Sequence, residues 1–311
     1  SMEQFDSWAR EGQARFTELH RLFDIYNNYE GLNNIKTIND YAGIQPVKVQ
    51  QEIIDLILFA KEWYDKTGGQ VNIAMGPVLE IWHEYRTRGK NNPDEAELPS
   101  MAELQAAVLH TDINKVIVDE ENMTVYLPDP EMSLDVGAIA KGFASEIVAR
   151  EFKQKGLESM IISSGGNVRL IGKPLDGIRS KWGVAVQDPD GNPHNPQDPP
   201  LDIIFATDQS VVTSGDYQRY YEVGGRIYHH IIDPQTLMPA NYYRAVTVMY
   251  EDSGVADFMS TTLFLLPFDE SKALAEKIQG LEALWVFPDG RIEVTEGMKK
   301  TLRDLGGATS S

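Results

Sequence analysis

The chain has 311 residues and no cysteine. Thiolate catalysis, cysteine-ligated metals and disulfide bonds are therefore excluded. It also lacks an apolar run of the roughly 20 residues that a membrane-spanning helix needs, and its first residues do not resemble a signal peptide. Without such a run, the composition is that of a globular chain long enough to bury a substantial core.

Positive charge is scarce. Lys and Arg number 28 against 47 Asp and Glu, which gives a net charge of −19. Such a surface repels phosphate backbones, and the basic residues are scattered along the chain, so nucleic acid is not an expected partner. If the ligand is a phosphate ester, a divalent metal held by carboxylates is the simplest source of local positive charge.

The pattern of apolar residues predicts a mixture of helices and strands. The predicted helices cover residues 5–29 (one helix or a pair), 49–66, 101–109, 140–155, 256–266 and 271–278. The predicted strands are 115–119, 123–127, 159–163, 182–186, 203–207, 210–213, 226–232 and 245–250, with a hairpin over 284–294. These elements lack a doubly wound rhythm and no linker divides them. We expect one domain over 1–311, of α+β or mixed α/β class, with a largely antiparallel sheet core and packed helices.

A loop of small residues, Leu134–Gly142, directly precedes a predicted helix. Such a loop presents free backbone N–H groups and the positive helix end to a ligand, and Lys141 adds a full charge. The alternative is an N-capped helix in which Asp135 and the glycines serve only the turn. The residues alone favour neither interpretation.

Two further segments are richer in glycine and polar residues than a core needs. Gly165-Gly166-Asn167 follows an apolar strand, but it is not the dinucleotide-binding fingerprint, and a plain turn is the simpler interpretation. Asp257 and Thr261 lie four residues apart on a predicted helix, so their oxygens could share one hard cation. In isolation, a threonine that bonds its own helix is the simpler explanation of that pair.

Taken together, these segments resemble the ApbE family of flavin transferases. Four motifs occur in family order: Leu134–Gly142, Gly165-Gly166-Asn167, Ser214-Gly215-Asp216-Tyr217 with His230-Ile231-Ile232-Asp233-Pro234, and Ala256-Asp257 with Ser260-Thr261. Weaker matches are Phe23–Tyr26 with Asn39, and Gly68-Gly69 with Gly76–Trp82. The resemblance extends from about Phe16 to Leu302.

This resemblance implies a T-fold-like architecture and a Mg²⁺-dependent enzyme. The family moves the FMN part of FAD onto a threonine hydroxyl of a target flavoprotein, such as a membrane redox complex subunit, and releases AMP. The alternatives are an FAD pyrophosphatase, which forms FMN and AMP, and a non-catalytic flavin-binding lipoprotein. The resemblance also implies an extracytoplasmic, lipid-anchored location. Since the family's first strand is not recognisable here, we expect the native N-terminal strand and targeting segment to be missing from these residues.

The resemblance also assigns roles to residues. Asp257 and Thr261 would ligate Mg²⁺ together with the Ala138 carbonyl, and Ser260 is a possible additional ligand. Ala138 replaces a common family glycine, which matters little if only its backbone is used. Asp257 and His230 would be catalytic, with His230 the general base and His229 structural, because neighbours on a strand face opposite sides. The residues expected to line the FAD site are Tyr26, Asn39, Asp135, Lys141, Gly165, Gly166, Asn167 and Ile231.

Overall fold

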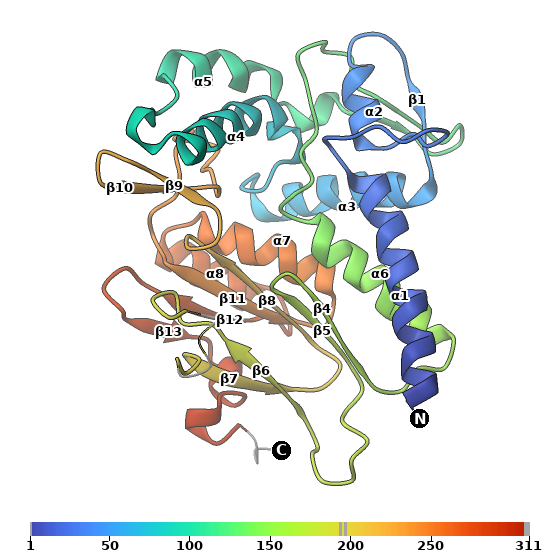
Figure 1. Cartoon of the computed structure of the whole chain (residues 1–311), viewed down its shortest axis with the longest axis vertical. Helices are drawn as coiled ribbons and strands as arrows, with labels where there is room; N and C mark the ends of the chain where they lie inside the picture. The colour runs from blue at the N-terminus through green and yellow to red at the C-terminus, as the bar shows by residue number, and fades with distance from the viewer. Residues whose placement is uncertain (1, 193–194, 196–197, 308–311) are drawn as a thin grey trace. The chain divides into compact units, whose positions relative to one another are not determined.

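The computed structural model describes residues 2–192, 195 and 198–307. The chain folds as two compact units, each assembled from two separate stretches of sequence. Unit 1 comprises Ser1–Ala140 and Tyr220–Pro239, and unit 2 comprises Lys141–Arg219 and Ala240–Ser311. Figure 1 labels the helices and strands of both units. The mixed α/β class with antiparallel sheets is the one predicted from the sequence.

Unit 1 is mainly helical. Its helices are α1 (Met2–Phe23), α2 (Ile35–Asp40), α3 (Gln51–Thr67), α4 (Gly76–Asn91) and α5 (Met101–Ala107). Its strands are β1 (Val47–Lys48), β2 (Ile117–Asp119) and β3 (Thr124–Tyr126), which form one antiparallel sheet in the order β1-β3-β2, and the hairpin β9 (Tyr220–Val223) and β10 (Arg226–His229). The hairpin reaches unit 1 from far along the sequence. The Tyr221 hydroxyl of β9 donates to the Glu97 carbonyl at 3.1 Å, and the Trp82 indole of α4 holds the segment after the hairpin by donating to the Leu237 carbonyl at 2.9 Å.

Unit 2 is built on a six-stranded antiparallel sheet with the order β13-β12-β11-β8-β5-β4. The strands are β4 (Met160–Ser164), β5 (Asn167–Ile171), β8 (Ser210–Gly215), β11 (Ala245–Tyr250), β12 (Glu282–Val286) and β13 (Ile292–Val294), and a separate ribbon pairs β6 (Trp182–Val186) with β7 (Asp202–Ala206). The helices are α6 (Ala140–Gln154), α7 (Ser253–Phe264), α8 (Phe268–Lys277) and α9 (Glu296–Lys299).

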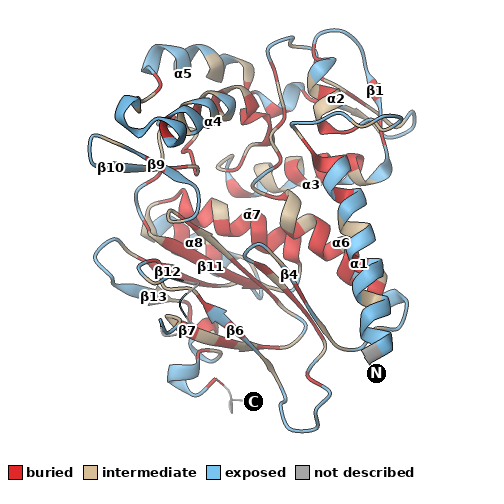
Figure 2. Ribbon diagram, viewed as in Figure 1, coloured by how far each residue is buried: buried red, intermediate tan, exposed pale blue. Residues whose placement is uncertain are grey.

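The two faces of this sheet are covered differently. Helices α7 and α8 lie over one face, and the β6–β7 ribbon lies over the other (Figure 1). Successive side chains of each strand face the ribbon and the helices in turn. Val211 and Ala245 pack into the core under the ribbon, whereas Trp285 faces the helices and donates its indole N–H to Ser271 of α8 at 2.9 Å. Helix α7 and the central strands are almost wholly buried (Figure 2). A polar side chain on the helix side of this sheet therefore needs a partner.

Several predicted elements are confirmed with small shifts at their ends. Strand β11 occupies the predicted residues 245–250, and α3 ends where Gly68 adopts the left-handed conformation at φ 75°. Strand β10 was predicted too long: it ends at His229 because the Ile231 N–H donates to His229 Nδ1 and Ile232 pairs with Pro239 instead. Helices α2, α4 and α9 and strands β1, β5 and β9 were not predicted.

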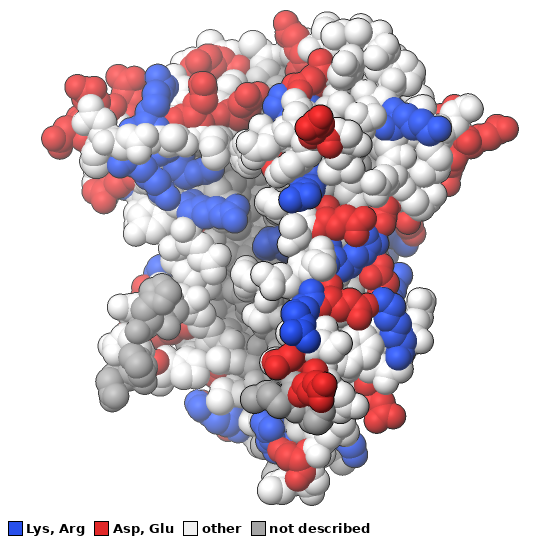
Figure 3. Space-filling model, turned by 45° about the vertical axis from the view of Figure 1, so that its right-hand side comes forward, with Lys and Arg blue, Asp and Glu red and all other residues white. Residues whose placement is uncertain are grey.

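The surface carries mixed charge. On the face in Figure 3, Lys and Arg side chains occur in small groups bordered by Asp and Glu. This agrees with the scattering of basic residues along the sequence. Among the described residues, no helix is long and apolar enough to cross a membrane.

Candidate functional site

Asp257 is the centre of the candidate site in unit 2. Its side chain is buried within α7, and the residue is only 3% exposed. One carboxylate oxygen accepts the Gly142 N–H at 2.8 Å, and the other lies 3.7 Å from the Lys141 ammonium, which is itself partly exposed. Burial raises the pKa of Asp257, while the Lys141 ammonium and the Gly142 N–H act in the opposite direction. A desolvated carboxylate with one loosely placed counter-ion is suited to binding a further cation.

The absence of a side chain at Gly142 allows α6 and α7 to approach so closely. A Cβ atom at this position would lie 2.2 Å from the Ser253 carbonyl oxygen and 2.4 Å from the Asp257 Cβ. The glycine of the sequence motif therefore serves helix packing, and its N–H fixes the carboxylate. Lys141, one residue earlier, is brought beside Asp257 by the same contact.

Three hydroxyl groups cluster where α7 meets β8, about one helical turn beyond Asp257. Ser260 Oγ donates to the Asp257 carbonyl at 2.9 Å and lies 2.8 Å from Ser214 Oγ of β8. Thr261 Oγ1 lies 3.2 Å from the same Ser214 Oγ. Ser260 is fully buried, whereas Thr261 is partly accessible. Of the predicted hydroxyl ligands, Thr261 is thus the one that a ligand can reach.

The Gly165-Gly166-Asn167 motif forms the tight turn between β4 and β5. Both glycines have positive φ angles, 54° and 97°, which only glycine adopts readily. Asn167 is 1% exposed and faces the helix side of the sheet, as does Arg169 two residues later. Among the described residues, no acceptor lies within hydrogen-bond distance of its buried amide nitrogen Nδ2, although the amide is near enough to Asp257 to act toward a lower pKa of that carboxyl. An anionic ligand oxygen would satisfy such a donor.

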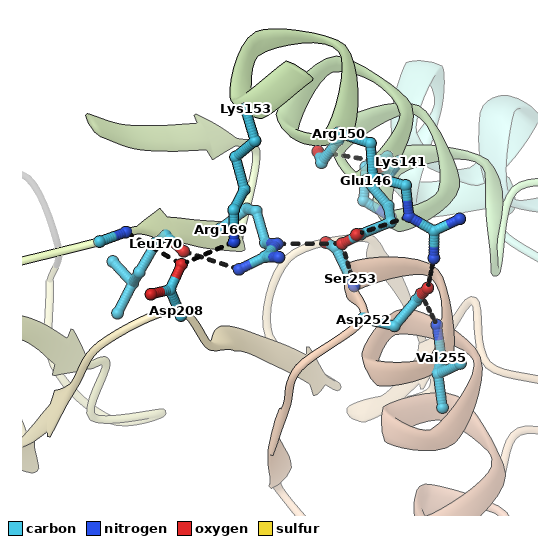
Figure 4. A network of polar contacts seen from close by, with 12 residues as sticks. Lys141, Glu146, Arg150, Lys153, Arg169, Leu170, Asp208, Asp252, Ser253 and Val255 are labelled. Carbon is cyan, nitrogen blue, oxygen red and sulfur yellow. Dashed lines mark hydrogen bonds and ion pairs between the residues drawn. The ribbon is translucent and has the colours of Figure 1, made fainter. Parts of the chain in front are cut away.

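A buried ion pair between Glu146 and Arg169 supports the contact between α6 and the start of α7 (Figure 4). Glu146 accepts from Arg169 Nε and from the Ser253 N–H, both at 2.9 Å. Glu146 comes one helical turn after Gly142, and Ser253 one turn before Asp257. The pair therefore fixes the start of α7 against α6. This ion pair was not predicted, and its only signal in the sequence is a charged residue at an otherwise apolar position of α6 and of β5.

The predicted site residues of unit 1 shape its own loops. The Asn39 amide accepts the Leu134 N–H at 2.7 Å and donates to the Leu134 carbonyl at 3.0 Å. The Asp135 carboxylate accepts the Gly137 N–H at 2.8 Å. These contacts fix the conformation of the small-residue loop ahead of Ala138. They agree both with a loop that only forms the turn and with a loop that presents its backbone to a ligand. Their predicted contacts with FAD stay predictions.

Three further predicted residues of unit 1 occupy different environments. Tyr26 is 61% exposed, and its ring lies 5.5 Å from that of His83. His229 is buried at the end of β10, whereas His230 follows the strand and is half-buried, and Ile231 is buried. Because the strand ends at His229, strand alternation does not govern His230, and that step of the sequence argument is wrong. The roles of the two histidines stay predictions.

The predicted residues are divided between the units. Unit 1 holds Tyr26, Asn39, Asp135, Ala138, His230 and Ile231, and unit 2 holds Lys141, Gly165, Gly166, Asn167, Asp257, Ser260 and Thr261. Within unit 2 the structure brings Lys141, Asp257, Ser260 and Thr261 together. Among the described residues no three His, Asp or Glu side chains form a metal-binding group. Any cation here would depend on Asp257 together with hydroxyl and carbonyl oxygens, a donor set that fits Mg²⁺.

Comparison with known proteins identifies the family. The sequence profile of the ApbE family matches residues 3–285. The FAD:protein FMN transferase of Treponema pallidum is 32% identical over 283 residues, 87% of this chain and 75% of that protein. A protein of the same name from Klebsiella pneumoniae is 31% identical over 274 residues, 86% of this chain and 81% of that protein.

Solved structures agree with the sequence relatives. The crystal structure of the ApbE protein of Thermotoga maritima superposes with a TM-score of 0.82 at 30% identity, covering 95% of this chain and 91% of that one. The flavin transferase ApbE of Vibrio cholerae, at 24% identity, has the same fold with a TM-score of 0.76 over 96% of this chain and 91% of that one. With its motifs, its fold and these relatives in agreement, the chain belongs to the ApbE family.

Proposed function

We propose that this chain is an FAD:protein FMN transferase that requires Mg²⁺. The observation that carries the proposal is the buried Asp257 carboxylate, held by Gly142 N–H beside the Lys141 ammonium and one helical turn from the accessible Thr261 hydroxyl. The names of the relatives supply the substrate, FAD, and a protein acceptor. The family resemblance supports a threonine acceptor in a flavoprotein of a membrane redox complex, and an extracytoplasmic, lipid-anchored native protein.

The reaction exchanges one phosphorus–oxygen bond for another. The acceptor hydroxyl oxygen bonds to the FMN phosphorus, the pyrophosphate bond to AMP breaks, and AMP leaves with the bonding electron pair. Mg²⁺, held by Asp257 and Thr261, would neutralise the phosphoryl oxygens. Lys141 provides a second positive charge, and the buried Asn167 amide near Asp257 provides a donor for a phosphate or ribose oxygen. His230 accepts the proton that the acceptor hydroxyl loses.

The proposal is tested by incubating the protein with FAD, Mg²⁺ and a threonine-containing acceptor protein. We expect AMP release in step with an increase of the acceptor mass by one FMN moiety, and neither when EDTA is present. Release of FMN and AMP without modification of any acceptor would instead identify a pyrophosphatase. Binding of FAD without turnover would identify a flavin carrier.

The paired histidines provide a matched test of the proton transfer. His230→Asn should lower the transfer rate by roughly 10² to 10⁴, the usual cost of removing a general base, while FAD still binds. His229→Asn should mainly lower the melting temperature, because His229 is buried and accepts the Ile231 N–H. An inactive but stable His229→Asn variant beside an active His230→Asn variant would reverse the assignment.

A further inference from the structure

Ser214 has no role in the reaction as proposed so far, although it lies between the two hydroxyls of α7. Its Oγ is 2.8 Å from Ser260 Oγ and 3.2 Å from Thr261 Oγ1. It belongs to β8, and the strand's alternation places it on the helix side of the sheet. Its neighbour Thr213 points to the other side, where its hydroxyl pairs with that of Thr247 at 2.8 Å.

The direction of each hydrogen bond in this group follows from proton counting. Every hydroxyl has one hydrogen to donate. Ser260 uses its hydrogen on the Asp257 carbonyl at 2.9 Å, so it can only accept from Ser214. Ser214 thereby uses its own hydrogen, so it can only accept from Thr261.

Thr261 has one alternative acceptor, and geometry disfavours it. The Asp257 carbonyl lies 3.5 Å from Thr261 Oγ1, which is long for a hydrogen bond between oxygens, and it already accepts from Ser260. The Thr261 hydrogen is therefore directed at Ser214. The lone pairs of the Thr261 oxygen are left free of hydrogen bonds to this group, on the hydroxyl that is accessible.

We propose that Ser214 is a positioning residue, which turns the Thr261 hydroxyl so that its lone pair, and not its hydrogen, faces the metal ion. This inference rests on the proposed function, because it assumes that Thr261 is a ligand. It assigns Ser260 to the relay of hydroxyls and not to the metal. The groups that orient a ligand typically change metal affinity 10- to 100-fold when they are lost.

The rest of the Ser214-Gly215-Asp216-Tyr217 motif holds this hydroxyl in place. A Cβ atom on Gly215 would lie 2.4 Å from the Tyr217 ring, so the ring packs directly on the backbone next to Ser214. Asp216 accepts from Arg244 Nε at 2.8 Å, and its N–H donates to the Arg244 carbonyl at 3.0 Å. The end of β8 is thus fixed on both sides.

The experiment measures binding of Mn²⁺, as a paramagnetic substitute for Mg²⁺, to the full chain by electron paramagnetic resonance titration without FAD. Ser214→Ala should weaken Mn²⁺ binding by about 10-fold or more. Ser214→Thr, which keeps the hydroxyl, should restore the affinity to near that of the wild type. Thr213→Val, the adjacent change on the opposite face, should leave it unchanged.

Activity gives a second readout. At saturating Mg²⁺ the Ser214→Ala variant should recover most of its rate, so the apparent Mg²⁺ requirement changes more than kcat.

If Ser214→Ala does not fold, Ser260→Ala tests the same group of hydroxyls. The loss of Ser260 frees the Ser214 hydroxyl to donate to Thr261, and this bond occupies a lone pair of the Thr261 oxygen, so Mn²⁺ binding should also weaken. The role of Ser214 would be overturned if Ser214→Ala (or Ser260→Ala, where Ser214→Ala does not fold) binds Mn²⁺ as tightly as the wild type. If Asp257→Ala fails to bind Mn²⁺ in the same titration, the proposed function stays intact. Absence of Mn²⁺ binding to the wild type would overturn both.

Discussion

Asp257 combines two properties that conflict in a folded protein. It is ionisable, and it is buried, so burial raises its pKa and its charged form costs folding free energy. Stability alone would favour an uncharged residue of the same shape. The carboxylate gains its advantage only when a cation binds, which is why its retention beside Lys141 points to function.

The first prediction concerns Asp257→Asn. Asparagine keeps an oxygen that can accept the Gly142 N–H, so the fold should persist, with a metal-free melting temperature equal to or above that of the wild type. Mg²⁺-dependent AMP release should fall to background, because the remaining oxygens are neutral. Thr261→Val should act in the same direction. Differential scanning calorimetry and an AMP assay check both halves, and an Asp257→Asn variant with undiminished Mg²⁺-dependent release would remove the metal assignment.

At the scale of helices and strands, the site depends on how α6 and α7 cross. Gly142 permits the close approach of α6 to the first turn of α7, and one turn later along α6 the Glu146 carboxylate accepts the Ser253 N–H at the α7 N-terminus. The negative carboxylate complements both the helix dipole and the buried Arg169 guanidinium. The crossing is therefore held at two points, with Asp257 at one of them.

The second prediction compares the loss of Glu146 alone with the loss of both charges of the Glu146–Arg169 pair. Glu146→Ala should cost about 3–5 kcal/mol of unfolding free energy, because it leaves Arg169 charged and unpaired in the interior. The double variant Glu146→Gln, Arg169→Met removes the charged pair, and its amide can still accept the Ser253 N–H, so most of the loss should be regained. Urea unfolding of the two variants measures the difference. A double variant no more stable than Glu146→Ala would show that the ion pair itself, and not the orphaned charge, sets the cost.

The parts of the site that depend on periodicity within one helix or strand could be predicted from the sequence. The parts that depend on contacts between different elements could not. Asp257 and Thr261 share a helix face by periodicity alone, and the confirmed span of β11 follows from an apolar run. Glu146 and Arg169 meet because α6 lies on β5, and no periodicity encodes that contact. Helix α2 has six residues and begins with the Asn34–Thr37 capping box, which is hidden in an asparagine-rich stretch. The end of β10 is set by one side chain accepting a backbone N–H, a contact invisible in the pattern.

At the scale of the whole molecule, the carboxyl groups divide into two sets with opposite effects on stability. Burial and the neighbouring Glu146 raise the pKa of Asp252, and burial raises that of Asp216 against the effect of Arg244. Asp24 behaves differently. Burial acts to raise its pKa, but hydrogen bonds from Asn27, Tyr26 and Tyr29 outweigh it and hold the pKa below the ordinary 3.8. The net charge of −19 adds self-repulsion at neutral pH.

The third prediction follows from the signs of these shifts. A carboxyl with a raised pKa binds its proton more tightly when folded, so it adds stability as the pH falls from neutral toward 3.8. Asp24 contributes stability above pH 3.8 that is lost as the pH falls through its folded pKa. Melting temperature should therefore peak in mildly acidic buffer, about pH 4 to 6, and drop steeply below it.

Two variants test which carboxyl groups cause the rise of melting temperature from neutral pH to the maximum and its fall at lower pH. Asp252→Asn, which keeps the N-cap bond to the Val255 N–H, should flatten the rise between neutral pH and the maximum. Asp24→Asn should lower the melting temperature at neutral pH, and the gap to the wild type should close as the pH falls from 3.8 through the lower pKa of the folded wild-type carboxyl, because that group is then protonated too. Melting temperatures measured from pH 3 to 8 decide the matter. A maximum at pH 8 would mean that the hydrogen-bonded carboxylates outweigh both the buried ones and the self-repulsion of the acidic surface.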